Sequence, residues 1–126
     1  MKDDRIILSF PKSIAPIQAS VYPLMCKDGL LEKAQKVREL LTDGGFLVEL
    51  DETGSIGRRY ARADEAGVPI GITIDYETLS NDTVTIRDRD SWRQVRSQIR
   101  DLPELLQKYF LDKITFENLG APSKEG

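Results

Sequence analysis

The sequence contains no histidine among its 126 residues. Histidine is the side chain that most often acts as a general base near neutral pH, and it is a common zinc ligand. Its absence argues against histidine-dependent catalytic triads and against the usual zinc sites. The only cysteine, Cys26, cannot form an internal disulfide, so a reducing compartment such as the cytoplasm is expected.

Long hydrophobic runs are also missing. No apolar stretch approaches the roughly 20 residues that a membrane-spanning helix needs. The first residues, MKDDRIILSF, do not have the pattern of a signal peptide. We therefore expect a protein that does not associate with a membrane.

Positive charge is not in excess. The 18 Lys and Arg residues are outnumbered by 21 Asp and Glu residues, which gives a net charge of -3. A domain that held a long nucleic acid by charge alone would be basic. A nucleic-acid partner would therefore have to be recognised locally, through specific contacts. The hydrophobic share of 40% is typical of a single globular domain with a buried core.

Hydrophobic periodicity predicts strands that alternate with helices. Strands are expected at residues 17–22, 46–50, 68–74 and 83–89, and helices at 29–43, 56–67 and 102–110. Asp28 is the expected N-cap of the first helix, and Gly44-Gly45 is its expected end. The alternation favours a parallel sheet with right-handed crossovers, but the strand at 83–89 follows a short turn, 76–82, and should be antiparallel.

Residues 90–101 fit two patterns. Their apolar residues recur at helical spacing, but the segment VRSQI could equally form an edge strand. Asp101 is expected to cap the helix that follows, which has proline in its first turn. The chain becomes polar after Phe110, and residues 118–126 are expected to fray.

Three arginines lie within five residues in DETGSIGRRYARAD, residues 51–64. Ser55 is the expected cap of the helix that begins there, and Arg58 and Arg62 lie on one face of it. A helix N-terminus carries partial positive charge, so arginine in its first turn is unfavourable unless an anion is near. Planar guanidinium groups, including that of Arg59, suit phosphates and nucleobases. The alternative is that acidic residues of the same segment neutralise them.

Charged residues also gather where predicted strands end. Asp75 and Glu77 follow the buried strand, at the edge where open α/β sheets bind ligands. Acid–base catalysis by this pair is disfavoured, because no nucleophile, metal ligand or lysine is near in sequence. The segment RDRDSW, residues 87–92, could read hydrogen-bond edges or form a salt-bridged surface. Tyr22, at the end of the first strand, is a candidate for stacking on a base.

Three segments together resemble a known module. They are APIQASVYPL (15–24), ETGSIGRRYARADEAGVPIGITIDYETL (52–79) and TVTIRDRDSWRQVRSQIRDLP (83–103). They are similar to the C-terminal anticodon-binding domain of class II aminoacyl-tRNA synthetases, in particular the dimeric glycyl-tRNA synthetases of eukaryotic and archaeal type. GSIGRRYARADE and VTIRDRDS are the most specific motifs. Asp51-Glu52-Thr53 departs mildly from the acid pair with serine that relatives often carry.

The resemblance implies an α/β fold with a mixed, mostly parallel five-stranded sheet flanked by three helices. It favours an edge strand at residues 94–99. It also implies three parts: a lead-in segment (1–14), the anticodon-binding domain (15–112), and a C-terminal extension with a frayed tail (113–126).

The function that the resemblance implies is recognition of the anticodon loop of glycine tRNA by part of a glycine–tRNA ligase. The parent enzyme would be a homodimer that attaches glycine with ATP and Mg²⁺ in a separate catalytic domain, for which 126 residues leave no room. No cofactor is expected in this domain, and neither DNA nor a membrane is an expected partner. The expected location is the cytoplasm, or mitochondria for a mitochondrial form.

Two other readings are open. One is an accessory or protein-interaction subunit with the same fold, as in mitochondrial DNA polymerase accessory factors. The other is a small flavodoxin-like nucleotide binder, which the missing phosphate loop and the missing histidine disfavour.

Glycine tRNAs carry two cytosines in the anticodon. Cytosine presents an N4 amino donor, which suits a carboxylate, and O2 and N3 acceptors, which suit arginine. A site for two cytosines should therefore combine acids with arginines. The candidate RNA-binding residues are Tyr22, Ser55, Arg58, Arg59, Arg62, Asp75, Glu77, Arg87, Asp88 and Arg89. No catalytic or metal-binding residue is predicted.

Overall fold

The computed structural model describes residues 17–25, 27–52, 58, 67–89 and 93–122. The elements, including two short 3-10 turns labelled η, are β1 (Ala19–Pro23), α1 (Leu30–Asp43), β2 (Val48–Leu50), β3 (Ile70–Ile74), α3 (Tyr76–Asn81), β4 (Thr83–Asp88), β5 (Gln94–Gln98), η2 (Ile99–Asp101), α4 (Leu102–Phe110), η3 (Phe116–Leu119) and β6 (Ala121–Pro122). In these ranges no helix has the length and apolar character to cross a bilayer.

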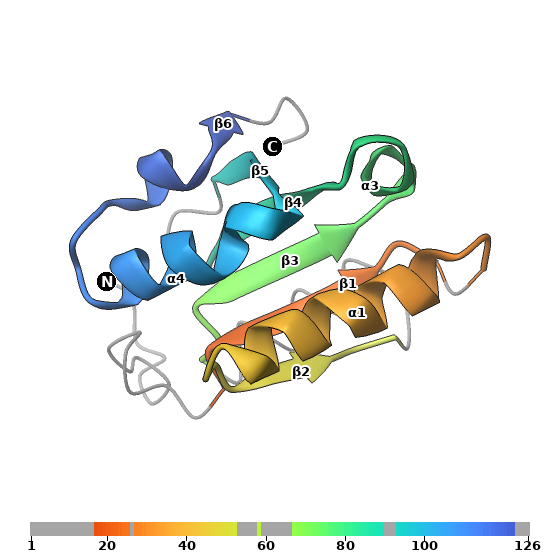
Figure 1. Ribbon diagram of the computed structural model, residues 1–126, viewed down its shortest axis with the longest axis horizontal. Coiled ribbons are helices and arrows are strands. Elements are labelled where there is room, and N and C mark those ends of the chain that lie inside the picture. The colour runs from red at the N-terminus through yellow and green to blue at the C-terminus, as the bar shows by residue number, and fades with distance from the viewer. Residues whose placement is uncertain (1–16, 26, 53–57, 59–66, 90–92, 123–126) are drawn as a thin grey trace.

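The strands form one mixed sheet in the order β2-β1-β3-β4-β5-β6 (Figure 1). β1 is parallel to β2 and β3, and the other neighbouring strands are antiparallel. Of the five predicted strands, β1, β2, β3 and β5 point the same way, so the predicted α/β fold is confirmed. The chain passes from β1 to β2 on one side and then to β3 on the other. The carboxyl ends of β1 and β3 therefore mark the point outside which such sheets bind ligands.

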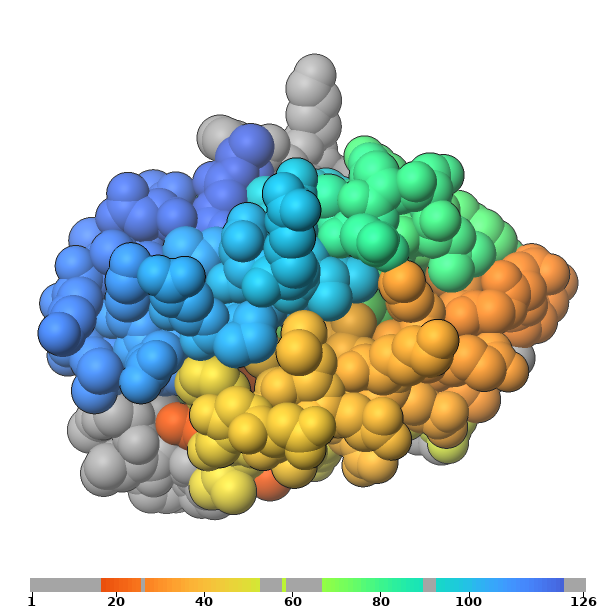
Figure 2. Space-filling view, in the orientation of Figure 1, coloured from red at the N-terminus to blue at the C-terminus, as the bar shows by residue number. Residues whose placement is uncertain are grey.

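One face of the sheet is apolar and is covered by α1 and α4 (Figure 1). The alternation of a strand places Val21, Ile72 and Ile86 on this face, where all three are fully buried. The buried positions of α1 are those that helical spacing predicts: Leu30, Ala34, Val37 and Leu41. Seen from this side, α1 and α4 with its neighbours form most of the surface and hide the strands (Figure 2). This layer is the hydrophobic core of the domain.

The opposite face of the sheet carries mainly polar side chains in two rows that cross the strands, and we call it the polar face. The first row is Glu49, Ser20, Gly71, Arg87 and Gln94, and the second is Tyr22, Thr73, Thr85 and Arg96. The polar face follows from the same alternation that builds the core, because successive residues of a strand point to opposite sides.

The start of α1 differs from the expectation. Gly29, not Asp28, is its N-cap residue, with φ of 86°. Asp28 itself has φ of 61°, and its carboxylate accepts a hydrogen bond from Tyr76 Oη at 2.7 Å. The carboxylate is thus bound to a distant phenol rather than to the helix. The end of α1 is as predicted, with Gly44 as the C-cap.

Residues 76–82, expected as a turn, contain the short helix α3. Asp75 caps it, because Asp75 Oδ1 accepts from Thr78 N at 3.1 Å and Thr78 Oγ1 accepts from Asp75 N at 3.0 Å. This reciprocal arrangement is a capping box. A helix of six residues is too short for its hydrophobic period to be recognised in the sequence.

The C-terminal residues 118–122, which we expected to fray, pack against the sheet. The turn η3 buries Phe116 and Leu119, and β6 pairs with β5, which is therefore not an edge strand along its whole length. Gly120 joins the two, and a Cβ at this position would collide with the backbone carbonyl of Arg96. The close approach of the two backbones requires glycine there.

Two helix predictions have separate outcomes. The helix predicted at 56–67 lies almost wholly outside the described residues; Arg58, which is described, is helical and exposed. α4 begins where predicted and has proline in its first turn, but the Asp101 side chain makes no capping hydrogen bond.

Gly120→Ala should lower the free energy of unfolding by roughly 1–3 kcal/mol, because the new methyl group forces η3 and β6 away from β5. Urea denaturation measures this change. Gly44→Ala is the matched control, because Gly44 has φ of -82° and an added Cβ would be 3.4 Å or more from its neighbours. Equal stability of the two variants would show that residues 116–122 do not pack as described.

Candidate nucleic-acid interface

A bidentate ion pair joins Asp75 to Arg96 on the polar face. Arg96 Nη2 donates to Asp75 Oδ1 at 2.8 Å, and Arg96 Nη1 donates to Oδ2 at 3.0 Å. Asp75 follows β3 and Arg96 lies in β5, so the pair bridges β4, which runs between them. The Asp75 and Arg96 side chains are 26% and 18% exposed. This partial burial makes the pair stronger than one at an open surface.

All five N–H groups of Arg96 donate to acceptors of the protein. Besides the two bonds to Asp75, Nε donates to Thr83 Oγ1 and Nη1 to Thr85 Oγ1, each at 2.8 Å. Nη2 donates to the Thr83 carbonyl at 3.2 Å. A guanidinium has five N–H donors in one plane, so this network fixes the orientation of that plane.

The ion pair keeps both groups charged. Burial raises the pKa of Asp75, but the hydrogen bonds and charge of Arg96, together with the hydrogen bonds of Thr78, lower it by more. The pKa of Asp75 is therefore below its ordinary value. The pKa of Arg96 is raised, mainly by the hydrogen bond to Asp75. The site presents a carboxylate and a guanidinium at every physiological pH.

Glu77 and Asn81 extend this network along α3. Glu77 Oε1 lies 3.7 Å from Arg96 Nη1, and Glu77 Oε2 accepts from Asn81 Nδ2 at 3.3 Å. Asn81 Oδ1 accepts from the backbone N and the Oγ1 of Thr83, at 3.2 and 2.5 Å. The Glu77 side chain is 58% exposed, so its carboxylate is accessible to a ligand.

The structure brings Asp75, Glu77 and Arg87 to the same side of the sheet. Arg87 lies on the polar face opposite Gly71 and Gln94. It is two residues along β4 from Thr85, or about 7 Å. These side chains provide the mixture of acids and arginine that the sequence predicts, with Arg96 in addition.

Asp88 and Arg89 do not join this group. Asp88 points to the helix-covered face, where its Oδ1 accepts from Tyr109 Oη at 3.3 Å. Arg89 Nη1 donates to the Gly67 carbonyl at 2.8 Å. Because β4 runs antiparallel to β3, Arg89 lies at the opposite end of β3 from Asp75. Residues 87–89 are therefore divided between the two faces and one end of the sheet.

Tyr22 lacks the exposed ring that stacking on a base requires. It is 1% exposed, and its ring occupies the space above Gly71, where a Cβ would lie 2.9 Å from Tyr22 Cε2. The side chain belongs to the packing of the sheet. Of the predicted arginine cluster, Ser55, Arg59 and Arg62 fall outside the described residues.

Arg96 is the site residue that sequence reasoning missed. Once residues 94–98 are assigned as a strand, their alternation places Val95 and Ser97 toward the core and Arg96 on the polar face. That alternation was a usable signal. The helical spacing of the apolar residues between 90 and 101 obscured it.

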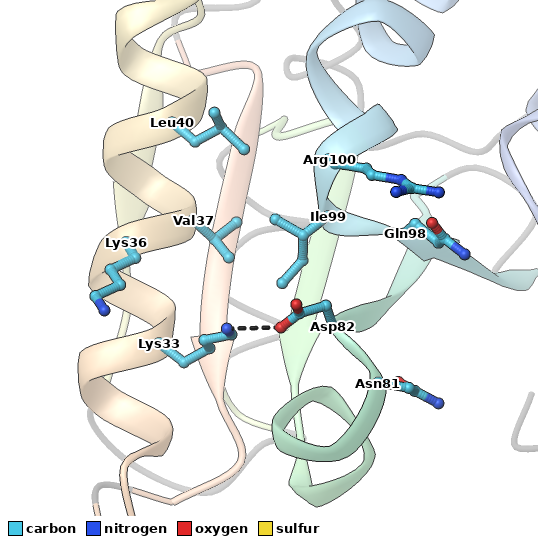
Figure 3. Close-up of a pocket in the computed structure, with 9 residues that line it drawn as sticks. All are labelled: Lys33, Lys36, Val37, Leu40, Asn81, Asp82, Gln98, Ile99 and Arg100. Atoms are coloured by element: carbon cyan, nitrogen blue, oxygen red, sulfur yellow. Dashed lines mark ion pairs between the residues drawn. The ribbon is translucent and has the colours of Figure 1, made fainter.

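A groove with a volume of about 580 Å³ lies between α1 and η2 (Figure 3). Val37 and Leu40 of α1 face Ile99 across it, and Lys33 Nζ lies 2.7 Å from Asp82 Oδ1. Four of its nine lining residues come from α1, on the helix-covered side. The groove is therefore separate from the Asp75–Arg96 pair. The part of the chain that the structure describes holds no cluster of three acidic, histidine or cysteine side chains suited to a metal.

Asp75→Asn should lower the free energy of unfolding by about 1.5–3 kcal/mol, the typical value of a hydrogen bond to a charged group. Asparagine still caps α3. The decrease in the free energy of unfolding therefore measures the contribution of the ion pair. The matched control is Asp82→Asn, which removes the exposed pair with Lys33 and should cost less than about 1 kcal/mol. Urea denaturation at neutral pH measures both. A smaller loss for Asp75→Asn than for Asp82→Asn would refute a stabilising ion pair.

The stability contributed by Asp75 should disappear in acid. Its folded pKa is lowered, so the contribution is present above the unfolded pKa of about 3.9 and is lost as the pH falls through the folded pKa. The stability difference between the wild type and Asp75→Asn should be constant from about pH 7 to 5 and narrow below about pH 4. A difference that persists unchanged at the lowest pH would point to a cause other than the carboxylate charge.

Comparisons with known proteins show which families this chain and its fold are similar to. Curated glycine–tRNA ligases match nearly the whole chain: the one from Aeropyrum pernix is 51% identical over 97% of the chain, that from Clostridium acetobutylicum 51% over 89%, and that from Methanocaldococcus jannaschii 45% over 85%. The chain spans about a fifth of the length of these relatives, namely 21%, 23% and 18%.

A solved structure has the same fold. Prolyl-tRNA synthetase from Cryptosporidium parvum, in complex with halofuginone and AMPPNP, matches 82% of this chain and 22% of its own, with a TM-score of 0.77 and 18% identity. At this identity the likeness concerns the fold alone. The family described as "Anticodon binding domain" matches residues 14–109. The chain therefore belongs to the anticodon-binding domain family.

Proposed function

We propose that this chain is the anticodon-reading part of a glycine–tRNA ligase and that the partly exposed residues of its polar face, at α3, β4 and β5, bind the anticodon loop of glycine tRNA. The observation that carries the proposal is the 51% identity to a glycine–tRNA ligase over 97% of the chain. Membership of the anticodon-binding domain family supports it. The accessory-subunit reading is not favoured, because the relatives are named as ligases.

The polar face has groups that match cytosine. Among the described residues, Asp75 Oδ2 accepts one hydrogen bond, from Arg96, which leaves room for a second donor. The exposed carboxylate of Glu77 accepts in the same way. Both suit the N4 amino group of cytosine, and Arg87 suits the O2 and N3 acceptors. Uracil has an acceptor in place of the amino group, so the carboxylates would repel it.

The net charge of -3 is consistent with this mode of recognition. Proteins read single-stranded RNA loops on the edges and faces of splayed bases rather than by bulk charge. In the proposed parent, a homodimer in the cytoplasm, a separate catalytic domain attaches glycine with ATP and Mg²⁺. Linkage to that domain would raise the effective concentration of this one at the anticodon.

The test of this function is a titration of the chain with a glycine tRNA anticodon stem-loop at fixed salt. The control is the same stem-loop with both cytosines changed to uracil. The native loop should bind more tightly, by about 5- to 150-fold for each well-recognised base, which corresponds to about 1–3 kcal/mol. Equal affinity for the two loops would contradict the proposed reading of the anticodon.

Glu77→Gln should weaken binding to the native stem-loop at least several-fold and reduce the preference for cytosine, because one carboxylate acceptor becomes an amide. The exposed position of Glu77 means that the fold should tolerate the change. Glu104→Gln is the matched control, since Glu104 is exposed on α4 and pairs with Lys108. If the two variants change the affinity equally, Glu77 does not contact the RNA.

A further inference from the structure

We propose that Arg96 contacts the bound RNA with the flat face of its guanidinium, on which one unstacked base lies, rather than with its N–H groups. This inference rests on the proposed function and assigns a specific role within that site. Thr83 and Thr85 are then positioning residues, because they hold the guanidinium plane from its edges, and Asp75 does so in addition to its proposed contact with cytosine.

The hydrogen bonds of Arg96 leave only its faces for a ligand. Its five N–H groups are all directed to Asp75, Thr83 and Thr85, at 2.8–3.2 Å. The side chain is still 18% exposed. A ligand that reaches the guanidinium therefore meets one of its faces, unless it first displaces Asp75, Thr83 or Thr85 from an N–H group.

Breaking such a bond is unfavourable at this site. Asp75 is held by Arg96 and also by Thr78 N and Thr78 Oγ1, both at 3.1 Å. Asp75 therefore cannot turn away without uncapping α3. Displacing it from Arg96 would leave the partly buried Asp75 carboxylate without its charged partner, which is unfavourable. A stacked base requires no such exchange.

We call the guanidinium face of Arg96 the platform, and its chemistry indicates which ligand it binds. Guanidinium planes stack on flat π systems, and RNA-binding proteins use them for bases that have left the helical stack. A base pair inside a duplex has both faces covered by its neighbours, so a duplex does not fit. The platform therefore takes one base of a single-stranded loop. The Glu77 side chain, which is 58% exposed and lies beside Arg96, suits the edge of an adjacent base.

The test replaces the loop nucleotides of the stem-loop one at a time, first by an abasic residue and then by 5-nitroindole, which is flat but pairs poorly. For the wild-type chain, one position should lose about 5- to 150-fold in affinity when abasic, and 5-nitroindole should restore most of that affinity. Arg96→Lys keeps the charge but has no plane. In that variant the abasic and 5-nitroindole loops should bind equally at that position.

Arg93→Lys is the matched control, because Arg93 is an exposed arginine just before β5. This variant should bind the 5-nitroindole loop more tightly than the abasic loop by the same factor as the wild type. If circular dichroism shows that Arg96→Lys does not fold, Thr85→Val replaces it. This variant removes one of the five acceptors and keeps the pair with Asp75. It should reduce the difference in affinity between the 5-nitroindole loop and the abasic loop at the same position.

The outcomes separate this inference from the proposed function. If the wild type does not distinguish the native loop from the uracil loop, the proposed function fails. If the wild type does distinguish them but no position favours 5-nitroindole over the abasic residue, or Arg96→Lys leaves that preference unchanged, the stacking role of Arg96 is overturned while anticodon reading stands.

Discussion

The guanidinium of Arg96 holds together segments that are distant in the sequence. Asp75 follows β3, Thr83 and Thr85 belong to β4, and Arg96 lies in β5. Asp75 also caps α3, so one carboxylate sets both the start of that helix and the position of the arginine. The geometry of the polar face depends on this shared group. A side chain with fewer or non-planar donors could not meet all of these acceptors at once.

The two faces of the sheet differ in composition and in what they contact. The apolar face packs against α1 and α4 and supplies most of the hydrophobic burial that stabilises the domain. The polar face carries the partly exposed Arg87 and Arg96 beside the buried Thr73 and Thr85. The C-terminal residues contribute from the side: Gly120 allows η3 and β6 to approach the backbone of Arg96 closely. The strand that bears the arginine is thus supported along part of its outer edge.

Pairing inside the protein explains how an acidic chain can belong to an RNA-binding family. Arg96 and Asp75 neutralise each other and are held together by two hydrogen bonds. Such a site contributes little long-range attraction, but its groups need not rearrange on binding. Preorganisation of this kind favours selectivity between bases over general affinity for RNA.

The amino-acid sequence by itself determined the alternation of strands and helices, the buried face of α1 and the burial of the strand at 70–74. It also carried the motifs that place the chain in its family. These are local properties, because helix and strand periods follow from the backbone over a few residues. The bulk of the fold was therefore predictable.

Only the tertiary structure decided which polar groups meet. Asp75 and Arg96 are 21 residues apart, and strand register brings them together. The same register lays the Tyr22 ring over Gly71 and sets Arg96 opposite Thr85, whereas the alternation of β4 alone places Asp88 on the opposite face from Arg87. Pairing between strands depends on long-range packing, which no local pattern encodes. The family and the fold could thus be read from the sequence, whereas the arrangement of the site required the assembled sheet.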